Sequence, residues 1–128
     1  MFSKENRRLP DAELLVMQVI WEAPDALSLN RIIDKLQQDG GPEWSVSTIR
    51  TLLGRLEKRG YLSVKKIDQE RCYTALVSEQ TYLKKATSGF LSQHYQNSIF
   101  RLVSTFADGR LTKEELKELK DIVSKLEE

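Results

Sequence analysis

Apolar residues recur with a helical period in the middle of the chain. Between residues 45 and 59 they are spaced i, i+3, i+4 and i+7, which places them on one face of a helix: Ile49, Leu52, Leu53 and Leu56. Gly60 follows directly and is a typical residue after a last helical turn. Two strand-like runs come next, at 62–66 and 72–76, and a polar turn at 67–71 joins them. The pattern therefore predicts a helix followed by a short β-hairpin.

Helical periodicity also marks much of the remaining chain. Further helices are predicted at 11–22, at about 30–38, from 78 to about 94, at about 96–107 and from 113 onward. Candidate N-caps are Ser28 or Asn30, Ser45 or Ser47, Ser78, and Thr112 with Glu115 in a capping box. Leu27–Leu29 is a candidate short strand that pairs with the hairpin. The predicted fold class is mainly α with a small β-wing: a winged helix-turn-helix DNA-binding domain over residues 1–77, then a helical dimerisation region over 78–128.

The balance of charge is informative only locally. The chain of 128 residues has a net charge of +1, with 40% hydrophobic and 30% charged residues, which is the composition of a soluble, helix-rich protein. Residues 45–66 nevertheless carry a charge of +5, because six Lys and Arg side chains stand against a single acid, Glu57. A local basic patch is typical of a nucleic-acid-binding face, and a merely solvated helix face is the alternative.

The polar face of the helix at 45–59 carries groups suited to reading DNA. Hydroxyl and guanidinium groups match the donors and acceptors that base edges present in the major groove. We expect base contacts from four side chains: Ser47, Thr48, Thr51 and Arg55. Arg55 can bond guanine in a bidentate manner, and threonine methyl groups can meet the thymine methyl. The alternatives are that the serines only cap the helix and that Arg55 pairs with Glu57 or with another neighbour.

A second set of side chains is expected to contact phosphate. These residues are Ser45, Arg50, Lys58, Lys65, Lys66 and Arg71. Phosphate contacts add affinity and salt dependence, but they do not select a sequence. For Ser45, capping the helix is the stronger interpretation. The predicted partner is therefore an operator in double-stranded DNA.

The helices after residue 77 carry apolar stripes that would make only a thin core on their own. We expect them to form a homodimer through eight side chains: Phe90, Ile99, Leu102, Val103, Phe106, Leu116, Leu119 and Ile122. A two-fold dimer places its two recognition helices about one DNA turn apart, roughly 34 Å. The alternative is that these helices merely cover the winged domain.

The rare residue types exclude several kinds of site. Cys72 and His94 are each the single representative of their type, so no internal disulfide can form and a zinc site lacks ligands. No nucleophile triad, phosphate loop or paired-carboxylate motif is present, so we expect no metal, no cofactor and no enzyme. No apolar run reaches the roughly 18–20 residues of a membrane span, and the N-terminus is polar. These features predict a cytoplasmic protein without membrane insertion.

Three segments resemble the penicillinase-repressor family: LPDAELLVMQVIW at 9–21, TIRTLL at 48–53 and RLEKRGYL at 55–62. The match continues through Tyr73–Thr74 to Tyr95 and so covers nearly the whole chain. This family includes the repressors of β-lactamase and methicillin-resistance genes and the copper-transport repressors. The resemblance implies a homodimeric winged-helix repressor that binds a palindromic operator and dimerises through its C-terminal helices. It also implies base contacts at the four positions named above.

Two departures from the family pattern bear on the inducing signal. The copper branch ends in a Cys-x-Cys metal box, whereas residues 125–128 of this chain are Lys-Leu-Glu-Glu, which excludes metal sensing by that route. The antibiotic-resistance branch is inactivated by cleavage of an Asn-Phe bond, and the matching residues here are Thr105 and Phe106. The resemblance thus adds a membrane protease sensor as a candidate partner, although the asparagine is missing. The alternative function is a winged-helix protein-interaction module that binds no DNA.

Overall fold

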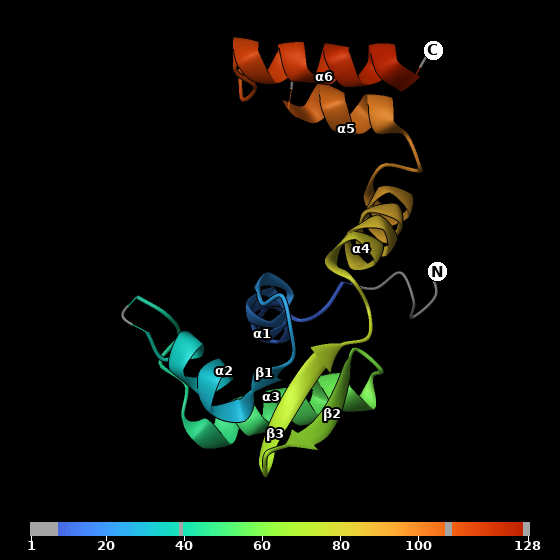
Figure 1. Ribbon diagram of the computed structural model, residues 1–128. Helices are drawn as coiled ribbons and strands as arrows, with labels where there is room; N and C mark the ends of the chain where they lie inside the picture. The colour runs from blue at the N-terminus through green and yellow to red at the C-terminus, as the bar shows by residue number, and fades with distance from the viewer. Residues whose placement is uncertain (1–7, 39, 107–108, 127–128) are drawn as a thin grey trace.

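The computed structural model describes residues 8–38, 40–106 and 109–126. These ranges form, in order, α1 (Asp11–Glu22), β1 (Leu27–Ser28), α2 (Leu29–Leu36), α3 (Val46–Lys58), β2 (Leu62–Ile67), β3 (Glu70–Ala75), α4 (Glu79–His94), α5 (Ile99–Phe106) and α6 (Lys113–Leu126). Figure 1 shows a lower body of α1–α3 with the sheet, and an upper body of α5 and α6, with α4 between them. The predicted mainly α fold with a small β-wing is confirmed. No helix in the described ranges combines the length and the apolar character needed to span a membrane.

The winged domain, residues 8–77, buries one face of each of its helices. The apolar period predicted for α3 is confirmed, because all four of its members are buried. They pack in one core with buried residues of α1 and α2: Val16, Met17, Ile20, Ile32 and Leu36. The sheet is antiparallel in the order β1-β3-β2, with Leu27 opposite Tyr73. The predicted short strand at 27–29 is therefore present, but Leu29 already begins α2.

The hairpin, which we call the wing, differs from its prediction at the turn. A turn was predicted at 67–71, but β2 extends to Ile67 and β3 begins at Glu70, so only Asp68 and Gln69 lie between the strands. Both turn residues have positive φ, 52° and 68°. A two-residue turn of this kind twists in the same sense as the strands, so strand pairing continues to the end of the hairpin. Arg71 consequently lies in β3 and not in the turn.

Side-chain caps mark where the helices begin. Ser28, Ser45 and Ser78 each accept a hydrogen bond from the backbone N–H three residues further on, at 3.3, 3.1 and 3.1 Å respectively. The alternative caps lie inside α2 and α3. The predicted capping box is confirmed, because the Thr112 N–H donates to the Glu115 carboxylate and the Glu115 N–H donates to the Thr112 hydroxyl.

α4 begins on the winged domain and then leads away from it. Its first two turns bring Tyr82, which is buried, into the core, and Ala86 packs beside it. α5 and α6 contain no buried residue, and Figure 1 draws them apart from α1 and the sheet. The alternative in which the C-terminal helices cover the winged domain therefore does not describe α5 and α6. The domain boundary at residue 77 stays a prediction, and a truncated winged domain should retain Tyr82.

Gly54 lies in the middle of α3, and no contact within the described chain requires a glycine at this position. A Cβ added there would meet no other part of the described chain within 4 Å. We predict that Gly54→Ala raises the free energy of unfolding by about 0.5–1 kcal/mol, because a helical glycine costs about that much relative to alanine. Urea denaturation gives the measurement. An unchanged or lower free energy of unfolding would show that alanine strains α3.

Candidate nucleic-acid interface

Hydroxyl groups hold the first turns of α3. Ser45 Oγ accepts a hydrogen bond from the Thr48 N–H at 3.1 Å and lies 3.0 Å from Thr48 Oγ1. Thr51 Oγ1 donates to the Ser47 carbonyl at 3.0 Å. Capping of this kind stabilises the end of the helix and keeps its side chains in fixed positions. Ser45 is therefore the N-cap of α3, and its contact with phosphate stays a prediction.

These hydrogen bonds limit how the threonines can read a base. A hydroxyl has one proton to donate, and Thr51 gives it to a backbone carbonyl. Its oxygen can still accept a hydrogen bond from a base amino group, and its methyl group can still meet a thymine methyl. The four residues predicted to contact bases are all exposed on α3: Ser47, Thr48, Thr51 and Arg55. The structure thus gathers them on one helix.

Cationic side chains continue the exposed face of α3 toward its C-terminal end. Arg50, Arg55 and Lys58 are exposed. Within the described part of the chain, the ion pairs join Arg8 to Asp11 and Arg59 to Glu13, so the alternative pairing of Arg55 with Glu57 is absent there. A shallow depression on this face is lined by Val46, Ser47, Arg50 and Thr51. The face therefore offers unpaired donors beside a surface that a base edge can approach.

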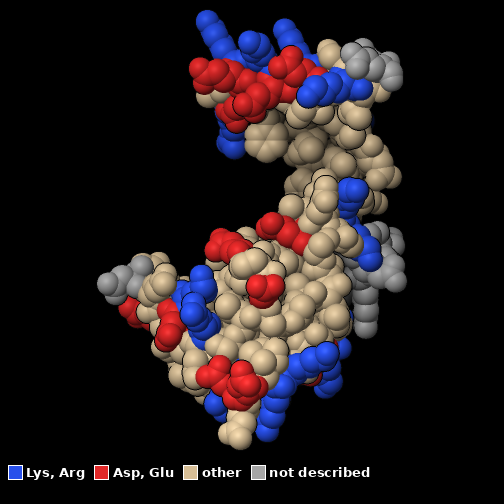
Figure 2. Space-filling model, viewed as in Figure 1, with Lys and Arg blue, Asp and Glu red and all other residues tan. Residues whose placement is uncertain are grey.

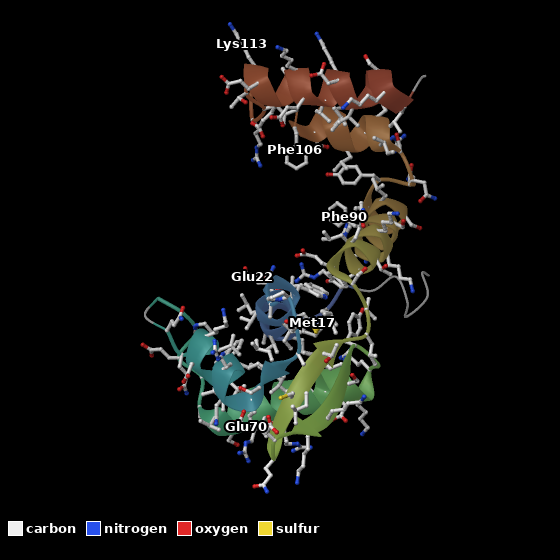
Figure 3. The ribbon with its side chains drawn as sticks, viewed as in Figure 1. Met17, Glu22, Glu70, Phe90, Phe106 and Lys113 are labelled. Atoms are coloured by element: carbon white, nitrogen blue, oxygen red, sulfur yellow. The ribbon has the colours of Figure 1, made fainter. Side chains whose placement is uncertain are left out.

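The wing adds a second group of cations. Lys65, Lys66 and Arg71 are exposed, and Lys66 lies directly opposite Arg71 in the strand register. Like charges in this arrangement repel each other, and a phosphate group near both would relieve the repulsion. Figure 2 shows Lys and Arg along the lower edge of the winged domain, interrupted by acidic side chains. Glu70 is one acid at this edge, as labelled in Figure 3.

Arg59 counts toward the basic patch in the sequence, but the structure uses it inside the protein. Its Nε lies 3.0 Å from Oε1 of Glu13, whose side chain is only 3% exposed. This contact is an ion pair and not an aligned hydrogen bond, because Oε1 has no hydrogen-bond partner among the described residues. Arg59 is the C-cap of α3, so the pair ties the end of α3 to α1. The charge available to an outside ligand over 45–66 falls from +5 to +4.

The ion pair predicts unequal effects of its two partners on stability. Arg59→Ala should lower the free energy of unfolding by about 1–3 kcal/mol, because it leaves the buried Glu13 carboxylate unpaired. Glu13→Gln removes the charge but keeps the shape, so it should cost less. Urea denaturation of both variants provides the comparison. A cost for Arg59→Ala no greater than that for Glu13→Gln would contradict the proposed role of the pair.

The three-helix core, the small sheet and the exposed α3 define a winged helix-turn-helix domain, a class of protein that reads DNA with one helix. Solved structures agree with this assignment. The DNA binding domain of the repressor BlaI matches with a TM-score of 0.52 and 36% identity, over 62% of this chain and 94% of that one. The monomeric form of Bacillus licheniformis BlaI in complex with the blaP half-operator matches with a TM-score of 0.51 and 37% identity, over 59% of this chain and 88% of that one.

Sequence relatives extend the likeness beyond the winged domain. The family described as penicillinase repressor matches residues 9–125. The methicillin resistance regulatory protein MecI of Staphylococcus aureus (strain N315) is 35% identical over 118 residues, 91% of this chain and 94% of that protein. The penicillinase repressor of Bacillus licheniformis is 33% identical over 121 residues, 94% of this chain and 92% of that protein. The chain therefore belongs to the penicillinase repressor family, which consists of DNA-binding transcriptional repressors and not of enzymes.

Proposed function

We propose that this chain represses transcription by binding a palindromic operator in double-stranded DNA as a homodimer. The observation that carries the proposal is the exposed polar face of α3, capped by Ser45 and accompanied by a basic wing. BlaI, which has a similar fold, is bound to a half-operator. The same mode of binding here would direct Ser47, Thr48, Thr51 and Arg55 toward base edges in the major groove. Operator DNA as the partner implies a cytoplasmic location.

The apolar surface of the C-terminal helices supports the second part of the proposal, the homodimer. Among the eight residues predicted at the interface, Ile99 is 65% exposed and Ile122 is 55% exposed. Burying a large apolar side chain gains about 1.5–3 kcal/mol, so a partner that covers this surface is favoured. The other six residues predicted at the interface are exposed or half-buried on α4, α5 and α6: Phe90, Leu102, Val103, Phe106, Leu116 and Leu119.

The arrangement of this apolar surface favours a second copy of the chain as the partner. Figure 2 shows charged side chains on the outer side of the upper body and mainly uncharged atoms on the side that faces the hollow. Figure 3 shows the rings of Phe90 and Phe106 projecting into that hollow. Most homo-oligomers are two-fold dimers in which the same patch meets itself, and such a dimer matches a palindromic site.

Release from the operator would follow from any event that disrupts the C-terminal helices. Cleavage between Thr105 and Phe106 by a membrane protease sensor is one such event, and a ligand between the helices is another. Both residues lie in the last turn of α5, where the Thr105 hydroxyl donates to the Arg101 carbonyl at 3.0 Å. Proteases cut locally opened segments, so cleavage would require α5 to unwind first.

The salt dependence of binding distinguishes this function from a protein-interaction module. Five cations are assigned to phosphate: Arg50, Lys58, Lys65, Lys66 and Arg71. If each contacts one phosphate, the logarithm of the binding constant should fall with the logarithm of salt concentration with a slope of about −4.5 per half-site. Titration of a fluorescent duplex at several salt concentrations measures it. Lys65→Ala should reduce the magnitude of the slope by about 1, whereas a slope near zero for the parent chain would favour the interaction module.

A further inference from the structure

Three aromatic side chains pack where α4 meets the winged domain. Trp21 comes from α1, Tyr61 from just before β2, and Tyr82 from α4. The ring centroids of Trp21 and Tyr82 are 5.6 Å apart, and those of Tyr61 and Tyr82 are 6.2 Å apart with an edge-to-face angle of 70°. We call these three residues the aromatic joint. Contacts of this kind add specific attraction to the burial of the rings.

Two hydrogen bonds connect the aromatic joint to the backbone. The Leu9 N–H donates to the Tyr82 hydroxyl at 2.8 Å in a buried position, and Trp21 Nε1 donates to the Val77 carbonyl at 2.9 Å. The first bond ties the segment before α1 to α4, and the second ties α1 to the segment before α4. Burial raises the pKa of Tyr61, the nearby Tyr82 raises it further and Arg59 lowers it, so the phenol stays neutral at physiological pH. The aromatic joint is therefore held by packing and by hydrogen bonds together.

The contacts of the aromatic joint attach the first turn of α4 to the winged domain. Past Ala86, α4 projects away and leads to α5 and α6 (Figure 1). α4 has 16 residues, which corresponds to a length of about 24 Å. The part of α4 from Tyr82 to His94 is about 18 Å long. A tilt of about 10° at the joint would move the far end of α4 by about 3 Å, close to the roughly 3.4 Å between successive base pairs. In a two-fold dimer both protomers would contribute such a displacement.

We infer that the aromatic joint, with Tyr82 as its main positioning residue, determines which spacing of operator half-sites the protein accepts. This inference rests on the proposed homodimer on two half-sites. A stiff joint holds the second winged domain near one distance from the first and so raises its effective concentration at one spacing. A loose joint spreads the second winged domain over several distances, which lowers the best affinity and broadens the tolerated spacing.

The double variant Trp21→Phe/Tyr82→Phe tests the joint, because it keeps aromatic rings but removes both hydrogen-bonding groups. Tyr73→Phe is the matched control, since Tyr73 is also buried, at 5% exposed, but lies in β3 outside the joint. The probes are a duplex of two inverted half-sites selected from random DNA with the parent chain, the same duplex with the spacer changed by one, two or three base pairs, and a duplex with a single half-site.

The double variant should bind the single half-site within about twofold of the parent chain, which also shows that the winged domain is folded. At the preferred spacing it should bind the two-site duplex about tenfold more weakly, and it should lose less affinity than the parent chain when the spacer changes. Tyr73→Phe should behave like the parent chain. An unchanged spacing profile, or an equal loss on the single half-site, would overturn the role of the joint. A parent chain that binds two half-sites no better than one would instead overturn the homodimer, and this inference with it.

Discussion

Ile122→Asp should convert the protein to a monomer and weaken its binding to a two-half-site operator about 100- to 10,000-fold. Ile122 is 55% exposed on α6, so the change disturbs the packing within one protomer less than the replacement of a buried residue would. In the proposed dimer the same side chain is buried against the partner, where an unpaired carboxylate is strongly unfavourable. The two winged domains would then bind as separate molecules, and the advantage of linking them would be lost.

Ser124→Asp is the matched control for this prediction. It places the same acid on the same helix at an exposed polar position, so it should remain dimeric and keep its affinity for the operator. Sedimentation velocity at micromolar concentration gives the oligomeric state, and titration of a labelled duplex gives the affinity. The dimer model would be refuted by an Ile122→Asp variant that is monomeric but binds the two-site operator as tightly as the parent chain.

Arg55→Ala should cost about 1–3 kcal/mol per half-site, and therefore about 2–6 kcal/mol for the whole operator. The guanidinium group is exposed on α3, and a bidentate bond to guanine would be lost with it. The variant should also discriminate less between bases at one position of each half-site. Its free energy of unfolding should stay within about 0.5 kcal/mol of the parent value, because the site is on the surface.

Lys65→Ala separates a base contact from a phosphate contact. Lys65 lies on β2 of the wing, and its loss should weaken operator and random DNA by similar factors. Arg55→Ala should weaken the operator far more than random DNA. Competition titrations with both duplexes measure the two effects. If both variants weaken the two duplexes in the same ratio, the roles of α3 and the wing have been assigned wrongly.

Local patterns were sufficient to predict the elements of the winged domain. α3 was predictable because its apolar residues follow one helical face and because Ser45 and Gly60 are typical of its two ends. The wing was placed correctly, but its turn was predicted too long. Neither Asp68 nor Gln69 is glycine, so no residue type marks this as a two-residue turn in which both residues adopt positive φ.

Contacts between distant segments were harder to anticipate. The burial of Glu13 could be predicted from the helical period, because Val16, Met17 and Ile20 follow it by three, four and seven residues on the buried face of α1. Its partner Arg59 is not marked by any local pattern and looks like one more cation of the basic patch. The hydrogen bond between Leu9 and Tyr82 joins residues 73 positions apart, a contact that periodicity cannot predict.

Selection of DNA from a random duplex pool by the 128-residue chain, followed by sequencing, tests the central claim most directly. The proposed homodimer should enrich an inverted repeat whose half-sites lie about 10–10.5 base pairs apart, centre to centre, or a multiple of that distance. A selection from the same pool with the Arg55→Ala variant should show weaker base preference at one position in each half of the repeat. Operator binding by α3 would be contradicted if no sequence were enriched and if the amount of DNA recovered did not depend on salt concentration.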